Sequence, residues 1–423
     1  MMKRKLPLFL LFCVYALCVG DAWGQGGIFR GMGAVNESMG GASTACPIDA
    51  AGSLYWNPAT MMGLYRSEVS LGLGLCLPDT TISSTLPNGV GGGETSSETG
   101  AIPIPSVALV KRDPCSRVAF GISFGAVGGA RTNYPASSIG SNGLPDNPIL
   151  STQNLGGMQC GYGNLNSCIE LLQVAPSVAF SITDRLSVAF GPTISMGDLS
   201  CDPLFIVEGA SDPSNTIYGA GSRWMWGAGF QAGVYFDTQT GWRFGASYKS
   251  QNWMEDFRMR CVDADGVAHV KKVDLDFPAI ISVGVSYAGF ERWLFSADFR
   301  YMFYEQAGYD DLEWRNIFCM ALGVQFIATE RLTLRAGYTF SENPIASVGS
   351  RANIASPLMP KHAIFFGGSF QMFENLSLHL TYGHVFENSI TGPYFGKELA
   401  NYGGSITNTA SAHLLTSGIS VYF

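Results

Sequence analysis

From residue 66 to the end of the chain, hydrophobic and polar residues alternate with a period of two in one segment after another. In the segment 331–340, RLTLRAGYTF, the apolar side chains share one face and the polar or smaller ones share the other. Segments 118–125 and 223–236 repeat the pattern. Because successive side chains of a strand point to opposite faces of its sheet, the alternation predicts β-strands with one apolar face each. Such faces pack against one another in a soluble sandwich and face lipid in a membrane barrel.

The links between these segments favour the barrel. Short turns, each with an acidic residue, occur within residues 113–116, 183–188, 237–241, 290–293, 329–334 and 373–378. Longer polar links lie between them, at roughly 78–103, 128–170, 198–222, 258–274, 304–314, 341–360 and 387–410. A strict alternation of short and long links is typical of an up-and-down transmembrane barrel, which has short periplasmic turns and long outer loops.

We therefore predict an all-β fold, a fourteen-stranded antiparallel transmembrane β-barrel in the outer membrane of a Gram-negative-type bacterium. An even strand number places both ends of the barrel on the same side. The chain ends with Ile419, Val421 and Phe423 on one face of the last strand. A terminal aromatic residue on an alternating strand is similar to the signal read by outer-membrane assembly machinery. Expected partners are that machinery, outer-membrane lipid and lipopolysaccharide. The predicted strands lie at about 66–77, 104–112, 117–127, 171–182, 185–197, 223–236, 242–257, 277–288, 292–303, 315–327, 331–340, 362–372, 376–386 and 412–423.

Composition agrees with this interpretation. Only 14% of the residues are charged, against about 25% in average soluble domains, while 47% are hydrophobic and 52 are glycine. After the N-terminus there is no uninterrupted apolar run of about 18 residues, so a helical membrane protein is not indicated. The net charge of −8 gives no support to nucleic-acid binding.

The first 24 residues have the pattern of a secretory signal peptide. Lys3, Arg4 and Lys5 precede an apolar stretch at 6–19, and Ala22-Trp23-Gly24 offers small residues around a cleavage site after Gly24. A signal-anchor helix and a lipoprotein are the alternatives, although the apolar stretch is short and residues 12 and 15 do not suit a lipobox.

Eight cysteines remain after this segment, in a compartment that permits disulfides. Cys160 and Cys168 are close enough in sequence to close a short loop, so we predict one disulfide there. The cysteine spacing matches no zinc pattern, and we predict no metal site and no cofactor.

A barrel of fourteen strands encloses more space than its own side chains fill, because eight strands are already enough for a filled interior. Residues 25–65 precede the first strand and are rich in small residues, but they also carry Leu54, Tyr55 and Trp56. Their length and composition suit a compact plug, or hatch, in the lumen. The expected organisation is a signal peptide at 1–24, a hatch at 25–65 and the barrel at 66–423.

The sequence also resembles a known family. The segments are 31–33 (GMG), 40–42 (GGA), 49–51 (DAA), 55–59 (YWNPA), 63–64 (GL), 120–134, 245–250, 277–301 and 334–382. Together they resemble the FadL/TodX-type outer-membrane transporters for long-chain fatty acids and other hydrophobic compounds, over nearly all of the mature chain. The resemblance implies a monomer that takes up such compounds passively, through capture by outer loops, a pocket above the hatch and lateral exit beside a kinked third strand. The family's kink proline is absent here, so Gly125, Gly128 and Gly129 are the candidates for the kink and lateral opening.

Candidate site residues follow from the hatch and from the substrate. Asn57-Pro58-Ala59 is the hatch motif, and its alternative role is a turn that only shapes the hatch. Phe29 and Trp56 are candidate ligand contacts. Lys249 and Arg335 are candidates for binding a fatty-acid carboxylate, because an unpaired buried charge is costly. For both, an interior ion pair or a charge at the barrel rim is the competing interpretation.

Two other function classes, an enzyme and a structural barrel, are the alternatives to a transporter. An outer-membrane lipid-modifying enzyme would need a histidine with a serine and an acid, and none of the five histidines has them at a recognisable spacing. A structural or adhesin barrel would need neither a hatch nor the long link 128–170. We therefore predict a transporter without catalytic residues, and the sequence leaves open which hydrophobic compound it carries.

Overall fold

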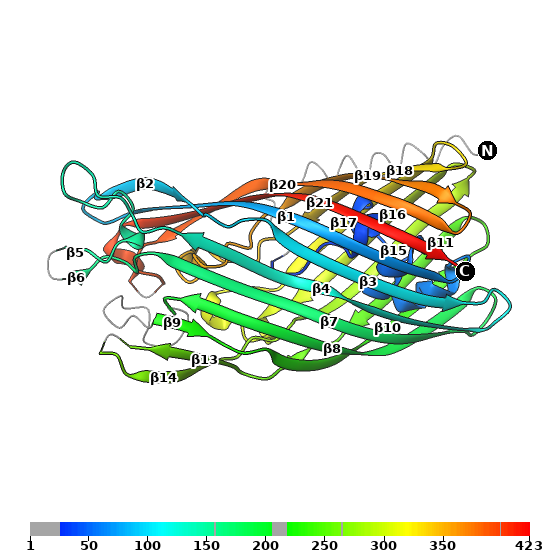
Figure 1. Ribbon diagram of the computed structural model, residues 1–423, viewed down its shortest axis with the longest axis horizontal. Coiled ribbons are helices and arrows are strands. Elements are labelled where there is room, and N and C mark those ends of the chain that lie inside the picture. Colours follow the sequence, from blue (N-terminus) through cyan, green and yellow to red (C-terminus); the bar gives the residue numbers. More distant parts are fainter. Residues whose placement is uncertain (1–25, 156–157, 205–217, 264, 398) are drawn as a thin grey trace.

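The computed structural model describes residues 26–155, 158–204, 218–263, 265–397 and 399–423. The predicted signal peptide, residues 1–24, lies outside the described residues. Fourteen long strands form the wall of a barrel (Figure 1). They are β1 (Glu68–Thr85), β3 (Ile102–Arg112), β4 (Val118–Tyr134), β7 (Leu165–Ser181), β8 (Leu186–Asp202), β10 (Met225–Asp237), β11 (Trp242–Lys249), β15 (Ala279–Phe290), β16 (Trp293–Phe303), β17 (Ile317–Ile327), β18 (Leu332–Ser341), β19 (His362–Phe373), β20 (Leu376–Pro393) and β21 (Ser405–Tyr422).

The barrel is closed and antiparallel throughout. Each wall strand pairs with the next wall strand along the chain, and β21 pairs with β1 from Glu68↔Tyr422 to Thr85↔Ser405. The predicted fourteen-stranded fold is therefore confirmed. No helix in the described part of the chain is long and apolar enough to cross a membrane.

Several wall strands extend further than the apolar pattern predicts. The first strand was expected at 66–77 and runs to Thr85, and the thirteenth was expected to end near 386 and runs to Pro393. In these extensions serine and threonine replace the apolar residues, as in the hydroxyl pairs Ser389–Thr409 and Thr391–Thr407, each 2.8 Å apart. The backbone ladder continues there although the alternation of apolar residues has ended.

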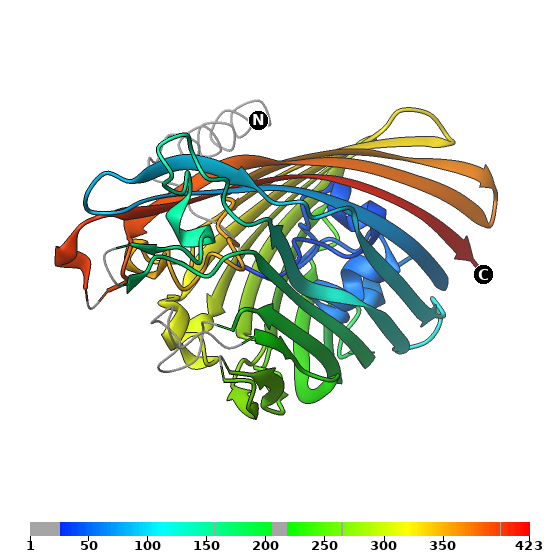
Figure 2. The same ribbon diagram turned by 60° about the vertical axis from the view of Figure 1, so that its left-hand side comes forward.

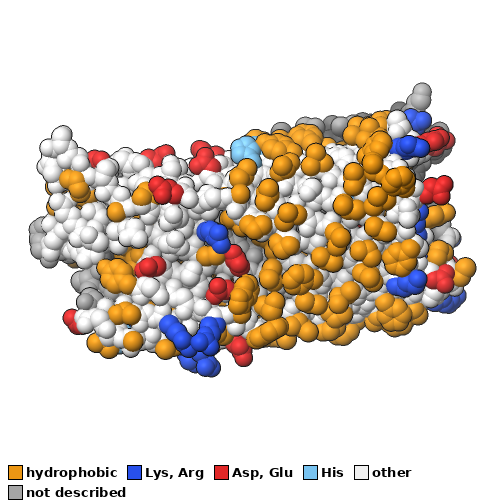
Figure 3. All heavy atoms as spheres, viewed as in Figure 1, with side chains coloured by type: hydrophobic (Ala, Val, Ile, Leu, Met, Phe, Trp, Pro, Cys, Tyr) orange, Lys and Arg blue, Asp and Glu red, His pale blue; other side chains and the backbone are white. Residues whose placement is uncertain are grey.

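Large apolar side chains cover the outside of the wall at the end that carries the tight turns. Figure 3 shows them as a broad band over the right-hand part of the barrel, while the opposite end is mostly polar. Phe120, Phe366 and Leu380 are each more than half exposed. Such a surface is stable in lipid and unfavourable in water.

Shorter elements extend from the polar end. The strands are β2 (Gly91–Ser96), β5 (Asn154–Leu155), β6 (Met158–Gln159), β9 (Tyr218–Gly221), β12 (Trp253–Met254), β13 (Phe257–Val262) and β14 (Ala268–Val273). The short 3-10 helices are η2 (Pro148–Leu150), η4 (Tyr304–Gln306), η5 (Asp310–Leu312), η6 (Ser347–Gly349) and η7 (Ala400–Tyr402).

The N-terminal segment folds inside the barrel, as Figure 2 shows in blue. We call residues 26–65 the hatch. It contains α2 (Gly33–Ser38), α3 (Ala50–Trp56) and η1 (Pro58–Gly63), and from residue 31 to residue 62 only Pro47 and Ile48 are not fully buried. Asp49 caps α3 by accepting a hydrogen bond from the Gly52 amide. The helices are short, so burial against the wall stabilises them rather than intrinsic propensity.

Candidate functional site

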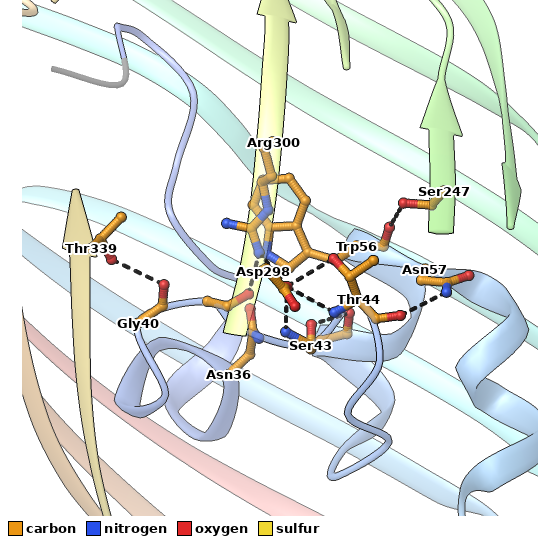
Figure 4. Close-up of polar contacts among 12 residues, drawn as sticks. Asn36, Gly40, Ser43, Thr44, Trp56, Asn57, Ser247, Asp298, Arg300 and Thr339 are labelled. Carbon is orange, nitrogen blue, oxygen red and sulfur yellow. Dashed lines mark hydrogen bonds and ion pairs between the residues drawn. The ribbon is translucent and has the colours of Figure 1, made fainter. Parts of the chain in front are cut away.

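The hatch is held to the wall by an ion pair on β16. Asp298 Oδ2 accepts hydrogen bonds from the backbone amides of Ser43 and Thr44, at 2.9 and 2.8 Å, and from the Thr44 hydroxyl at 2.7 Å (Figure 4). Arg300 Nη2 lies 2.8 Å from the same oxygen and donates to the Gly41 carbonyl at 2.6 Å. Both side chains are fully buried. A buried ion pair needs further hydrogen bonds, and the hatch loop supplies them to Asp298 Oδ2 and Arg300 Nη2. Among the described residues, Asp298 Oδ1 and Arg300 Nε and Nη1 have no hydrogen-bond partner.

The same loop requires glycine at two successive positions. Gly40 and Gly41 have φ values of +65° and +80°, a region that favours glycine. A Cβ on Gly41 would lie 1.8 Å from the Arg30 carbonyl oxygen, so the loop also needs the missing side chain. The turn presents the Gly40 and Gly41 carbonyls to Thr339 and Arg300, respectively.

Asn57 of the predicted hatch motif joins two parts of the hatch to the wall. Its Nδ2 donates to the Thr44 carbonyl at 2.7 Å and to the Val234 carbonyl of β10 at 2.9 Å, while its Oδ1 accepts from the Ala59 amide at 3.1 Å. Pro58 occupies the first turn of η1, where a missing N–H costs nothing. The motif thus has the geometry of a structural anchor.

Two cations contact the aromatic pair at the end of α3. The Arg300 guanidinium lies 3.5 Å from the centre of the Trp56 ring, and Lys249 Nζ lies 4.0 Å from that of Tyr55. Cation–π attraction of this kind is strongest when the cation is removed from water, as both are here. The contacts attach β11 and β16 to the hatch.

The wall is interrupted between the second and third wall strands. The β3–β4 ladder runs from Arg112↔Ala119 to Ser106↔Gly125, and among the described residues no β3–β4 pair follows. Beyond that point residues 102–105 of β3 pair with β1 and not with β4, and β7 is the wall strand that pairs with β4. Pro103 and Pro105 lie in this part of β3, which has a neighbour on the β1 side only, and proline is tolerated on such an edge because it has no N–H to donate. We call this interruption the wall gap.

A bulge in β4 lies beside the wall gap. The β4–β7 register shifts between Ala126 and Gly128, and Val127 is the extra residue. Ala119, Gly121, Ser123 and Gly125 are buried before the bulge, whereas Thr132 and Tyr134 are buried after it, so the inward-facing set changes from odd to even positions. A one-residue bulge has this effect on a strand. The predicted kink candidates Gly125, Gly128 and Gly129 flank Val127.

The start of the hatch is hydrogen-bonded to this bulge. Ile28 forms an antiparallel bridge with Gly128, the Phe29 amide donates to the Val127 carbonyl, and the Gly129 amide donates to the Gly27 carbonyl, both at 3.0 Å. The Tyr55 hydroxyl lies 2.9 Å from the Phe29 carbonyl oxygen, which ties α3 to the same place. The chain between Gly27 and Phe29 therefore acts as a short extra strand inside the wall.

Two apolar cavities meet at this extra strand. Cavity A holds about 900 Å³ of empty space, including the part open to solvent, and cavity B about 970 Å³. Both are lined by Gly27, Ile28, Gly129 and Leu358. Cavity A continues among β7, β8 and the aromatic residues Phe257, Phe277, Tyr304, Tyr309 and Trp314. Cavity B reaches both edges of the wall gap, with Ile102 and Ile104 on one side and Ala130, Arg131 and Thr132 on the other.

Two hatch groups with shifted pKa values border cavity B. Burial raises the pKa of Glu37 from 4.5 to about 7, and a hydrogen bond from Thr416 opposes the shift. Burial lowers the pKa of Arg30, whose Nη2 donates to the Pro360 carbonyl at 3.2 Å.

The structure separates the four candidate ligand contacts. Phe29 lines cavity B. Trp56 and Lys249 lie together, but in the packing between hatch and wall, and they line neither cavity. Arg335 faces the interior as its strand phase predicts, and it donates to Gln325 at 2.7 Å and Ser369 at 2.6 Å.

The predicted Cys160–Cys168 disulfide is not formed. Both thiols are free: Cys160 contacts the Gln153 carbonyl in an outer loop, and Cys168 on β7 lies between Arg131 and Glu170. The two cysteines are close in sequence but not paired, because Cys160 lies in the loop against Gln153 whereas Cys168 lies on β7 against Arg131 and Glu170. His379, the histidine considered for an enzyme, is buried between the hydroxyls of Ser369 and Ser420 at 2.7 and 2.9 Å, away from both cavities.

Comparison with known proteins gives a consistent result. The family model described as outer membrane protein transport protein (OMPP1/FadL/TodX) matches residues 30–423. Three solved structures share the fold. The toluene transporter TodX of P. putida has 17% identity and a TM-score of 0.69, covering 93% of this chain and 99% of its own. The toluene transporter TbuX of Ralstonia pickettii has 18% sequence identity and a TM-score of 0.66, and the match covers 93% of this chain and 99% of TbuX. A FadL homologue of Pseudomonas aeruginosa has 16% sequence identity and a TM-score of 0.66, and the match covers 94% of this chain and 100% of the homologue. Among curated protein sequences, none matches this chain.

Proposed function

The chain belongs to the OMPP1/FadL/TodX family of outer membrane transport proteins, and from that premise we propose that it carries neutral hydrophobic compounds passively across the outer membrane. A compound captured by the outer loops enters cavity A, passes the extra strand at 27–29 into cavity B, and leaves sideways through the wall gap into the membrane. The hatch blocks the direct route to the periplasm.

One observation carries this proposal: cavity B lies between the extra strand and an interruption in the ladder of the wall. The lining of cavity B includes Ile102 and Ala130, which are on opposite sides of the wall gap. A hydrophobic compound that leaves between two strands moves from an apolar cavity into lipid without crossing water. That route needs no energy source, because apolar surface stays out of water along it.

The lining of cavity A favours an uncharged compound. Among its described lining residues Asp276 is the one charged side chain, and Lys and Arg are absent. A fatty-acid carboxylate there would be desolvated beside a carboxylate, which is unfavourable. The five aromatic side chains suit an aromatic ring, since such rings pack in offset or edge-to-face pairs. We therefore propose small aromatic hydrocarbons, the class to which toluene, the named substrate of the TodX and TbuX structures, belongs.

A long-chain fatty acid is the second candidate, favoured by Arg30 in cavity B. Its Nε is buried and has no hydrogen-bond partner among the described residues. A carboxylate placed there would gain a charge-assisted hydrogen bond while its chain lies in the apolar part of the cavity.

Uptake by cells tests the two candidates together. Cells that lack other such transporters would express this chain and be given radiolabelled toluene or radiolabelled oleate. Faster toluene entry than in cells with empty vector supports the proposal, and oleate entry alone supports the second candidate. If neither compound enters faster, the transport function proposed here is wrong.

A further inference from the structure

An outer hairpin carries a group of cations that the transport route does not use. The paired residues of β13 and β14 include Arg258, Arg260, Lys271 and Lys272 and contain no carboxylate. The hairpin's acidic residues lie at its tip and at its base instead. This concentration is unusual in a chain with 14% charged residues and a net charge of −8.

The strand register places three of the cations on one face. Phe257, Met259 and Cys261 are buried against the body of the protein, so Arg258 and Arg260 point outward. Lys272 is directly opposite Arg258 and therefore shares its face. All three are exposed, whereas Lys271 is opposite the buried Met259. We call Arg258, Arg260 and Lys272 the cationic face.

The cationic face lacks enough internal counter-charge. Lys272 pairs with Asp256 at 2.7 Å, but neither Arg258 nor Arg260 has an ion pair with a described residue. Like charges directly opposite each other destabilise a strand pair, and Arg258 and Lys272 stand in that relation. An external anion would remove this repulsion.

The position of the hairpin indicates where such an anion lies. Trp226 and Trp253 are more than half exposed on the outer surface, near the polar ends of β10 and β12. Exposed aromatic residues at this height form the girdle that marks the membrane interface of a barrel. Arg258 follows Trp253 by five residues, at most about 17 Å of extended chain. Figure 3 shows a compact group of Lys and Arg at the edge of the apolar band, where β13 and β14 lie in Figure 1.

The cationic face also exposes apolar side chains. Val270 is opposite Arg260 and 61% exposed, and Val262 on the same face is 41% exposed. A surface that mixes guanidinium groups with valines at the membrane boundary is suited to an amphiphile that has anionic groups above acyl chains. A soluble anion would gain nothing from the valines.

We propose that the cationic face binds the phosphate groups of lipopolysaccharide in the outer leaflet. Guanidinium groups form paired hydrogen bonds with phosphate, and cations close to an anionic lipid surface each add to the attraction. Bound lipopolysaccharide would hold the β13–β14 hairpin at the membrane surface. The hairpin leads directly into residues 274–278, of which Leu275, Phe277 and Pro278 line cavity A.

The test uses the full-length protein, purified in detergent and freed of lipid, and a triple variant R258Q/R260Q/K272Q. The matched control is R185Q/R292Q/R331Q, which removes three exposed cations from the tight turns at the opposite end of the barrel. Binding of bisphosphorylated lipid A is measured by native mass spectrometry, alongside dephosphorylated lipid A and phosphatidylglycerol. Heat-modifiable gel mobility verifies that every variant is folded.

We expect the triple variant to bind bisphosphorylated lipid A at least about tenfold more weakly than the wild type. The control variant should match the wild type, and dephosphorylated lipid A should bind to the wild type about as weakly as bisphosphorylated lipid A binds to the triple variant. Equal binding by the wild type and the triple variant would overturn the proposal. Equal binding of phosphatidylglycerol and bisphosphorylated lipid A to the wild type would overturn the assignment to lipopolysaccharide.

Discussion

Ile28 forms an antiparallel bridge with Gly128, so the first described residues of the chain are paired to the wall at the bulge of β4. This one contact links the hatch, both cavities and the wall gap. A change that shifts residues 27–29 would therefore alter the connection between the cavities without unfolding the barrel.

Replacing Gly128 by alanine should displace the extra strand, because a Cβ there would lie 2.6 Å from the Gly27 carbonyl oxygen. Losing about one net hydrogen bond shifts the population of the displaced state by up to about fivefold. We expect toluene uptake to rise by a similar factor. The control is Gly368→Ala on β19, where the added Cβ has no neighbour nearer than 3.4 Å. Unchanged uptake in Gly128→Ala would show that the extra strand does not limit passage.

Replacing Asn57 by alanine should loosen the hatch. The variant loses the bonds to the Thr44 and Val234 carbonyls and the cap of η1, and we expect the free energy of unfolding to fall by about 2 to 3 kcal/mol. Ion conductance in planar bilayers should increase. Asn375→Ala, at an exposed tight turn, is the control. If the conductance and the urea midpoint of Asn57→Ala equal those of the wild type, Asn57 is not an anchor.

The Asp298–Arg300 pair should show strong coupling in a double-mutant cycle. Asp298→Ala leaves a buried guanidinium without its counter-charge. We expect the free energy of unfolding, measured with urea, to fall by about 3 to 5 kcal/mol. The double variant D298A/R300M removes the charge as well, so it should be less destabilised than the sum of the single variants. Additive losses would mean that the two side chains act independently.

Glu37 should make stability depend on pH. Its pKa is raised from 4.5 to about 7 in the folded protein, so the folded state holds this proton more tightly than the unfolded state. Stability should therefore fall as the pH rises from about 4.5 to about 7, by roughly 3 kcal/mol at most, and should not change further above that range. Glu37→Gln should remove this part of the pH dependence of stability, and at about pH 8 the variant should be more stable than the wild type. Parallel urea-midpoint curves for the two proteins would contradict the assignment.

The wall could be predicted from the sequence because each strand repeats one simple pattern. In β18 every second residue from Leu332 to Phe340 is apolar and faces outward. The residues between them face the lumen, and this alternation correctly placed the Arg335 side chain inside the barrel. In β4 the alternation was predicted for residues 118–125, and the strand was expected to end at 127, whereas it continues to Tyr134. The bulge at Val127, which changes the inward set, leaves no mark in a run of glycines and alanines. The outer halves of β1 and β20 were taken for loops because serine and threonine hide the alternation.

The contacts of the hatch could not be predicted from the sequence. Asp298 and Arg300 stand two residues apart at inward positions of a predicted strand, and in a charge-poor chain two opposite charges at this spacing are a sign of a buried ion pair. Even so, their partners Gly41, Ser43 and Thr44 lie more than 250 positions away, and no local pattern connects them. Asn57 and Val234 are 177 positions apart, so the motif was likewise identified without its role.

Blocking the wall gap tests the proposed route most directly. Ala130 lines cavity B at the edge of the gap, and Ala130→Trp would fill that space. The control is Ala336→Trp on the outer surface of β18, which adds the same bulk away from both cavities. Both variants must insert and show the heat-modifiable mobility of a folded barrel. We predict that cells with Ala130→Trp take up radiolabelled toluene no faster than cells with empty vector, while Ala336→Trp retains wild-type uptake. Wild-type uptake by a correctly folded Ala130→Trp protein would contradict exit through the wall.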